Sequence, residues 1–199
     1  MKIVLASTSP YRAALLKKTG LPFSTAKPTI EEDAIKIEIL KTNKSAKDLA
    51  LALSIEKGES IWSPAPDKNI LVISGDQVAE CEGQIIGKPG NFDSAVKQMQ
   101  FLQNRTHRLF TALSLFGSNG NENHVSVTEL KMRALNDREI QHYLQLDTPF
   151  DCAGSYKIEE NGIALFSSIV SDDFTAIQGI PMQWLCNKLK EYNCEFFQT

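Results

Sequence analysis

The sequence predicts a mixed α/β protein. Apolar runs of strand length alternate with helix-forming segments along the 199 residues, a pattern typical of strands joined by crossover helices. Two longer strand-like segments, 109–116 and 124–133, flank the polar loop 117–121. Such a pair predicts an antiparallel hairpin, so we expect parallel and antiparallel strands in the same sheet.

The first strand-to-helix turn organises the chain. The apolar run 3–5 predicts a buried strand, Ser9 an N-cap, and Pro10 the first helical position, where no N–H is needed. The helix ends before Gly20, and a short strand is expected over 22–26. Free N–H groups at this helix start, together with the Arg12 guanidinium, form a natural anion site. The alternative is a well-capped helix whose arginine is solvated.

Acidic and basic residues follow at particular places. Residues 28–33 read as a loop that ends in Glu31, Glu32 and Asp33, a run that usually means a solvated surface. Residues 46–61 predict an amphipathic helix with Lys57 near its apolar face, where a lysine commonly extends its amine to solvent.

A loop over 63–69 leads to the most apolar strand, 70–73, which runs into the segment Ser-Gly-Asp-Gln. Asp76 is therefore expected at the carboxyl end of a strand, where α/β folds place ligand chemistry. Residues 78–81 and 84–86 predict a hairpin, and its exit places Lys88 on a stiff Gly-Lys-Pro turn.

The remainder alternates in the same way. Helices are expected over 92–102, 136–146 and 181–192, and a strand over 162–170. The segment 152–157 is rich in small residues, which suits a close approach of backbone to a ligand. The three histidines are scattered, without the spacing of metal ligands.

Composition narrows the classes of function. The formal net charge of −3 and the lack of a basic stripe argue against a nucleic-acid partner. No apolar run is long enough to cross a membrane, and no signal-peptide pattern opens the sequence. The four cysteines form no CxxC pair. We therefore expect free thiols and a cytoplasmic protein.

Cations and carboxylates at strand ends suit a metal-dependent reaction of a phosphate compound. Lysine and arginine hold phosphate oxygens, while carboxylates bind Mg²⁺ or activate water. Each residue alone also has an ordinary structural explanation, so their order and spacing carry the argument.

That order resembles the Maf family of nucleoside triphosphate pyrophosphatases over essentially the whole chain. The matching motifs are Leu-Ala-Ser-Thr-Ser-Pro-Tyr-Arg at 5–12, the acidic pair ending at Glu32, Ser-Gly-Asp-Gln at 74–77, Gly-Lys-Pro at 87–89 and Ala-Gly-Ser at 153–155. The resemblance implies one Maf-type domain over 1–199 with an inosine-triphosphatase-like α/β fold. In that fold a long twisted mixed sheet is split into two lobes around a central cleft, and homodimers are possible.

The resemblance also implies roles for individual residues. Water would attack the α-phosphorus of a nucleoside triphosphate, with Asp76 as general base or as a carboxylate that orients the metal. Glu32 and Asp76 would hold Mg²⁺ or Mn²⁺. The triphosphate would be bound by five residues: Ser7, Ser9, Arg12, Lys57 and Lys88.

Three features resemble the Maf subfamily that hydrolyses 7-methylguanosine triphosphate: Gln77 after the aspartate, Cys-Ala-Gly-Ser at 152–155, and Glu159 two residues after Lys157. N7-methylation makes the guanine ring cationic, so the Glu159 carboxylate would favour it, and Tyr11 could stack on it. The chain departs from the subfamily in its reversed Ser-Gly order before Asp76, in Asn161, where an aromatic residue is expected, and in a second glutamate, Glu160, that could read the base instead.

Two alternatives stay open. A pyrophosphatase for dTTP or UTP would use the same chemistry on another base. A non-catalytic, nucleotide-sensing regulator of septum formation would use the same binding residues, but it would need no general base.

Overall fold

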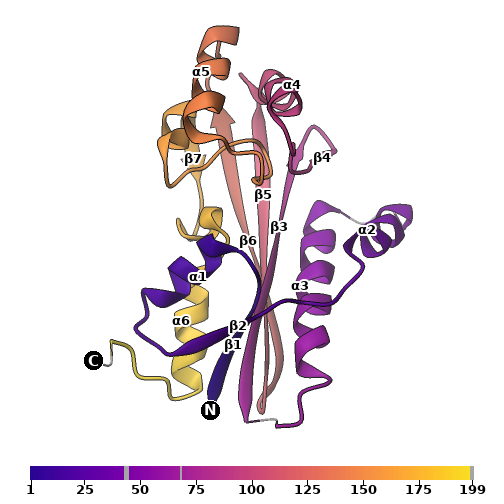
Figure 1. Ribbon diagram of the computed structural model, residues 1–199, viewed down its shortest axis with the longest axis vertical. Coiled ribbons are helices and arrows are strands. Elements are labelled where there is room, and N and C mark those ends of the chain that lie inside the picture. Colours follow the sequence, from indigo (N-terminus) through magenta and orange to yellow (C-terminus); the bar gives the residue numbers. More distant parts are fainter. Residues whose placement is uncertain (43–44, 68, 198–199) are drawn as a thin grey trace. The chain divides into compact units, whose positions relative to one another are not determined.

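The computed structural model describes residues 1–42, 45–67 and 69–197, and it confirms the mixed α/β class. Seven strands form one sheet in the order β2-β1-β3-β5-β6-β7, with β4 paired to β3. The strands are β1 (Lys2–Ala6), β2 (Phe23–Ala26), β3 (Ile70–Cys81), β4 (Gln84–Ile86), β5 (Thr106–Gly117), β6 (Gly120–Met132) and β7 (Phe166–Val170). The α-helices in the described residues are α1 (Pro10–Lys17), α2 (Glu32–Lys41), α3 (Ala46–Trp62), α4 (Phe92–Leu102), α5 (Asp137–Asp147) and α6 (Met182–Glu191) (Figure 1).

The chain divides into two compact units. Unit 1 comprises Met1–Asp76, Thr111–Ser126 and Asp173–Thr199, and unit 2 comprises Gln77–Phe110 and Val127–Asp172. The boundary crosses β3 directly after Asp76 and also crosses β5 and β6. The central cleft implied by the family resemblance stays a prediction.

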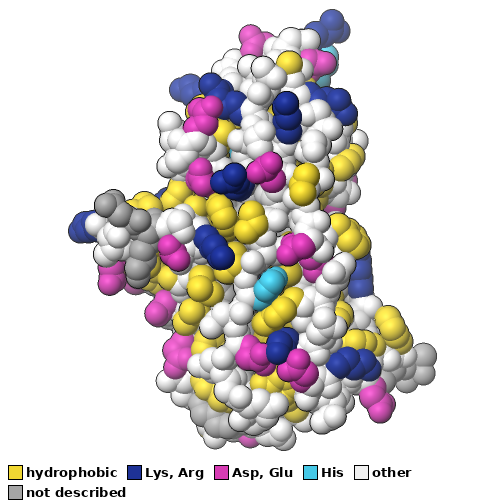
Figure 2. Space-filling model, turned by 180° about the vertical axis from the view of Figure 1, so that it is seen from behind, with side chains coloured by type: hydrophobic (Ala, Val, Ile, Leu, Met, Phe, Trp, Pro, Cys, Tyr) yellow, Lys and Arg dark blue, Asp and Glu magenta, His cyan; other side chains and the backbone are white. Residues whose placement is uncertain are grey.

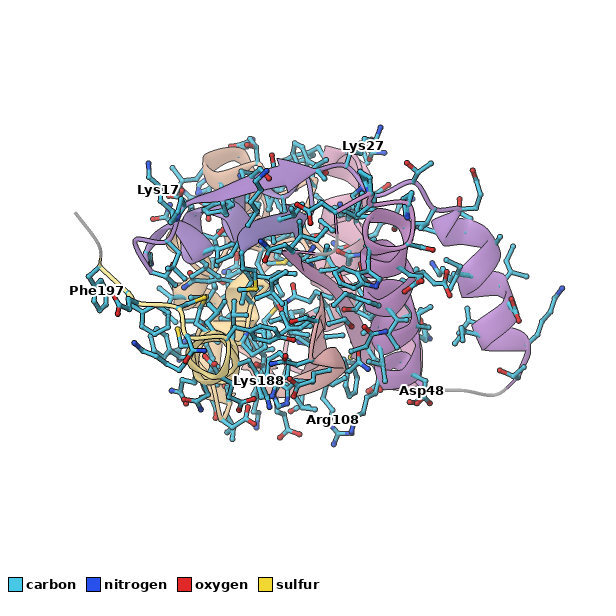
Figure 3. The ribbon with its side chains drawn as sticks, turned by 90° about the horizontal axis from the view of Figure 1, so that it is seen from below. Lys17, Lys27, Asp48, Arg108, Lys188 and Phe197 are labelled. Carbon is cyan, nitrogen blue, oxygen red and sulfur yellow. The ribbon has the colours of Figure 1, made fainter. Side chains whose placement is uncertain are left out.

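Unit 1 has three layers, because side chains alternate between the faces of its strands. One set packs against α1 and α6 and includes Leu5, Ile73 and Leu115. The opposite set packs against α3 and includes Val72 and Phe116. The parallel pairs β1–β2 and β1–β3 lie between these two layers (Figure 1). Seen along the strands, Asp48 of α3 and Lys188 of α6 mark the opposite faces (Figure 3).

Unit 2 is built from antiparallel pairs and two helices. β4 pairs with the end of β3, and β7 pairs with β6. Helices α4 and α5 pack on each other. A buried aromatic group fills the interior: the His107 ring donates to or accepts from the Tyr156 hydroxyl at 2.9 Å, and the Tyr156 ring meets Phe166 edge to face. Of the three histidines, His107 is therefore part of the core.

Most predicted elements are confirmed, and three differ. Asp76 lies inside β3 rather than at the end of a strand, because 79–81 pair with β4 and the strand continues. The parallel pairing of β3 with β1 does end at Ser74, two residues earlier. Helix α2 was not predicted: the loop after Pro28 gives way to a helix at Glu32. The strand expected from 162 begins at Phe166, after a 3₁₀ turn over Asn161–Leu165. Residue 68 of the predicted loop 63–69 lies outside the described residues.

The surface carries charges of both signs. Lys and Arg side chains are interspersed with Asp and Glu on the face that Figure 2 shows, in keeping with the net charge of −3. Among the described residues, no helix is both long and apolar enough to cross a membrane.

Candidate functional site

The turn between β1 and α1 holds Arg12 in a defined orientation. The Ser9 side chain caps α1 by accepting from the Arg12 backbone N–H at 3.4 Å. The Ser7 hydroxyl accepts from the Ser9 N–H at 3.1 Å and from Arg12 Nη1 at 3.4 Å. Arg12 Nε donates to the Gly179 carbonyl at 3.0 Å. A guanidinium has five N–H donors, so Arg12 is oriented by the protein and still has donors for an anion.

Lys57 joins two carboxylates from different elements. Its Nζ lies 2.6 Å from Asp76 Oδ1 on β3 and 2.9 Å from Glu32 Oε1 at the start of α2. The side chains of Lys57 and Asp76 are 12% and 13% exposed, whereas that of Glu32 is 56% exposed. Lys57 lies near the apolar face of α3, and the Asp76 carboxylate holds its amine in the interior. The amine therefore does not extend into solvent.

Burial dominates the electrostatics of this cluster. It raises the pKa of Asp76 above its ordinary value, although Lys57 and Arg12 both act to lower it and Glu32 adds to the rise. Burial also lowers the pKa of Arg12, against the opposing effect of Asp76 and Glu32. Arg12, Lys57 and Asp76 thus lie largely out of water, whereas Glu32 contributes its carboxylate from the exposed start of α2.

The two carboxylates of the cluster face the same cation. Asp76 Oδ1 and Glu32 Oε1 converge on one point, which Lys57 Nζ occupies. Mg²⁺ is commonly bound by one or two carboxylates together with substrate phosphates and water. In the described part of the chain, no group of three or more His, Cys, Asp or Glu side chains could hold a metal ion.

The remaining predicted residues lie in unit 2, apart from Tyr11. Lys88 is exposed on the turn after β4, and Gln77 is half-buried on β3. Glu159 and Glu160 are both exposed on a turn closed by Gly162 N–H, which donates to the Lys157 carbonyl at 3.0 Å. Tyr11 is half-buried on α1 of unit 1.

Helix α5 holds the turn that carries Glu159. The Lys157 N–H donates to the Tyr143 hydroxyl at 2.9 Å. The Asp147 carboxylate accepts from the Asn161 N–H at 3.1 Å and from its Nδ2 at 2.6 Å. The turn is therefore fixed at both ends, so its two carboxylates project from a stable support.

The motifs found in the sequence thus fall on two supports: the Arg12–Lys57–Asp76–Glu32 cluster of unit 1, and the Lys88 and Glu159 turns of unit 2. A comparison with protein families matches residues 2–192 to the family described as Maf-like protein. The chain belongs to the Maf family.

Relatives of this chain can be aligned with it over nearly its whole length. The chain is 40% identical over 190 residues to a protein of Xanthomonas axonopodis pv. citri, covering 96% of each chain. It is 38% identical to a protein of Bdellovibrio bacteriovorus, covering 96% of this chain and 97% of that one. It is 39% identical to a protein of Pseudoalteromonas atlantica, covering 100% and 98%. Each of these relatives is named 7-methyl-GTP pyrophosphatase.

A solved structure shares the fold of this Maf chain. The Ham1 protein of Staphylococcus aureus superposes with a TM-score of 0.53 at 13% identity, covering 96% of this chain and 100% of that one. At this identity the likeness concerns the fold alone.

Several residues that hold the candidate site residues in place could not be predicted from the sequence. The Gly179 carbonyl orients Arg12 from 167 residues away. Tyr143 and Asp147 support the Glu159 turn across 14 residues each. Their contacts are long-range, and neither a backbone carbonyl nor a helix tyrosine carries a motif that would reveal such a role.

Proposed function

We propose that this Maf protein hydrolyses 7-methylguanosine triphosphate to the monophosphate and diphosphate, with a role in clearing modified nucleotides. The observation that carries the proposal is the cluster in which Lys57 bridges Asp76 and Glu32 beside Arg12. The names of relatives at 37–40% identity support the substrate. Since the family match runs through both units, we further propose that they belong to one Maf-type domain.

In this proposal the cations of the cluster compensate the triphosphate. Arg12 can bind phosphate oxygens through two donors in one plane. Ser7 and Ser9 keep the start of α1 and Arg12 in place, and Lys57 and Lys88 add positive charge. These interactions place the α-phosphorus for attack by water and stabilise the charge that develops on the leaving diphosphate.

Asp76 serves that attack in one of two ways. A carboxylate whose pKa is raised by burial can accept a proton from water as a general base. The same carboxylate, together with Glu32, would hold Mg²⁺ or Mn²⁺. Such an ion would polarise phosphate oxygens and lower the pKa of water. Both roles require the charged carboxylate of Asp76.

We further propose that the enzyme selects the base of its substrate by charge and by aromatic stacking. The Glu159 carboxylate favours a cationic 7-methylguanine over neutral guanine, Tyr11 contributes a stacking face, and Gln77 contacts the base. Glu160 is the alternative carboxylate on the same turn. A cytoplasmic location is part of the proposal and is supported by the four free cysteines; a homodimer is compatible with it.

The test is diphosphate release from four substrates by the purified chain: 7-methyl-GTP, GTP, dTTP and UTP. We expect the highest kcat/KM with 7-methyl-GTP. Glu159→Gln should remove that advantage while activity on GTP stays level or rises, because a charge is lost and the size is kept.

Glu160→Gln is the matched control, since it neutralises the neighbouring exposed carboxylate and should leave the preference intact. The reverse result would move base reading to Glu160. Preference for a pyrimidine triphosphate would contradict the substrate but not the reaction, and binding without any diphosphate release would favour the sensor.

A further inference from the structure

Gln98 of α4 contacts two of the motif-bearing turns of unit 2 at once. Its Nε2 donates to the Gly87 carbonyl at 2.9 Å, and its Oε1 accepts from the Ser155 hydroxyl at 2.5 Å. Gly87 directly precedes Lys88, and Ser155 ends the Ala-Gly-Ser segment that leads to Glu159. One side chain therefore joins two turns that are 68 residues apart in the sequence.

The chemistry of the two partners fixes the orientation of the amide. A carbonyl oxygen can only accept, so the amide nitrogen must face Gly87. The amide oxygen is then left for Ser155, whose hydroxyl donates. Gln98 thus uses both ends of its amide, which offers a donor and an acceptor on one planar group.

The Ser155 turn needs such support. Gly154 and Ser155 have φ of 84° and 59°, the left-handed region that a non-glycine residue adopts only when its surroundings hold it there. Ser155 is fully buried, so an unpaired hydroxyl would cost free energy. The Gln98 amide thus satisfies the hydroxyl and stabilises the strained turn.

The Lys88 turn is tied to the same region by its backbone. The Gly90 N–H donates to the Phe150 carbonyl at 3.0 Å, and the rings of Phe92 and Phe150 meet edge to face. These contacts hold the far end of the turn, whereas Gln98 holds Gly87, beside the lysine itself.

We propose that Gln98 is a positioning residue that couples the phosphate-binding Lys88 turn to the base-reading segment 153–159. This inference rests on the proposed function for the roles of the two turns. Gln98 itself touches neither phosphate nor base: it sets the distance between the residues that do.

The test compares three single variants with diphosphate release from 7-methyl-GTP. Gln98→Glu keeps an acceptor for Ser155 but cannot donate to Gly87, so we expect KM to rise about 3- to 10-fold, the effect of one lost hydrogen bond, with kcat nearly unchanged. Gln98→Ala loses both contacts and should also reduce the preference for 7-methyl-GTP over GTP. Gln100→Ala, on the same helix and bonded to Asp137 instead of the two turns, is the matched control and should behave as wild type.

A double-variant cycle separates positioning from general damage. On a Lys88→Ala background, Gln98→Glu should change KM by less than about twofold, because the residue through which it acts is gone. An unchanged KM for Gln98→Glu, or an equal rise with and without Lys88, would overturn the proposal.

Amide hydrogen exchange of the substrate-free protein tests the coupling without activity. Gln98→Ala should speed exchange in both 87–90 and 153–157, whereas Gln100→Ala should speed neither. Unchanged exchange in both segments would overturn the coupling. A wild type that releases no diphosphate would overturn the proposed function and leave the exchange result to decide on Gln98.

Discussion

Asp76 is buried and feels the positive charges of Lys57 and Arg12, yet its pKa is raised rather than lowered. Desolvation therefore costs the carboxylate more than its two cationic neighbours return. A carboxyl group whose pKa is higher in the folded than in the unfolded state binds its proton more tightly when the protein is folded. In its protonated form, at low pH, it therefore stabilises the folded state. That contribution is lost as pH rises through the folded-state pKa. Above that pKa the charged Asp76 thus costs stability, as expected of a residue kept for chemistry.

Asp76→Asn removes this charge while keeping the shape of the side chain. We expect turnover to fall by roughly 10²–10⁴-fold, the range for losing a general base, and the melting temperature at pH 7 to stay level or rise, since Lys57 keeps Glu32 as a partner. Steady-state kinetics and thermal unfolding check the two halves. Asp33→Asn, an exposed carboxylate beside Glu32, should change neither. A folded Asp76→Asn protein with normal turnover would exclude Asp76 from the mechanism.

The direction of the Asp76 pKa also predicts the pH profile. The proposed base must be deprotonated, so kcat/KM should fall as pH decreases through its raised pKa. The acid limb should therefore lie above pH about 4, the ordinary value for aspartate. The residual activity of Asp76→Asn should lack that limb. A limb at or below the ordinary value would contradict the assignment.

At the scale of elements, the contact between α3 and β3 sets the distance between Lys57 and Asp76. Three buried serines join α3 to β3 and to its neighbour β5: Ser54 of α3 and Ser114 of β5 share a hydrogen bond at 2.8 Å, and the Ser74 hydroxyl of β3 donates to the Ser54 carbonyl at 2.7 Å. Gly58 allows the close approach, because a Cβ there would lie 2.1 Å from the Phe116 ring and 2.5 Å from Ser74 Oγ.

Gly58→Ala should therefore destabilise the protein despite the higher helix propensity of alanine. We expect a loss of roughly 1–3 kcal/mol in the free energy of unfolding, as for other overpacked contacts, and a lower kcat as Lys57 moves from Asp76. Denaturant unfolding measures the first effect. Glu56→Ala, exposed on the same helix, controls for propensity. A Gly58→Ala protein as stable and active as wild type would show that the contact can relax.

Individual helices and strands differ in how well the sequence predicts them. Local signals were sufficient where an element carries its own cap or period: Ser9 with Pro10 for α1, Asn136 for α5, and the run 92–102 for α4. Asp76 was misplaced because its polar segment resembles a turn, whereas pairing to β4 continues the strand. Helix α2 has no buried residue and no side-chain cap, so it lacks the amphipathic signal that prediction uses.

In the whole molecule, the sequence motifs named four charged residues that lie together, but they did not predict how these residues are arranged. Four predicted residues, Arg12, Glu32, Lys57 and Asp76, meet in unit 1 although they come from four elements. These residues come close together because of the order of the strands and the packing of the helices, and neither can be predicted from a local sequence pattern. Gln98 and Gly179 were missed for the same reason, since each contacts a residue far away in the sequence, Ser155 and Arg12 respectively.

In the proposed reaction, unit 1 directs water to the α-phosphorus of a nucleoside triphosphate. Hydrolysis of 7-methyl-GTP in ¹⁸O-labelled water, with Mg²⁺ present, tests it directly, because the label marks the phosphorus that was attacked. We expect one labelled oxygen in 7-methyl-GMP and none in the released diphosphate. Label in the diphosphate, or release of single phosphates in place of diphosphate, would contradict it.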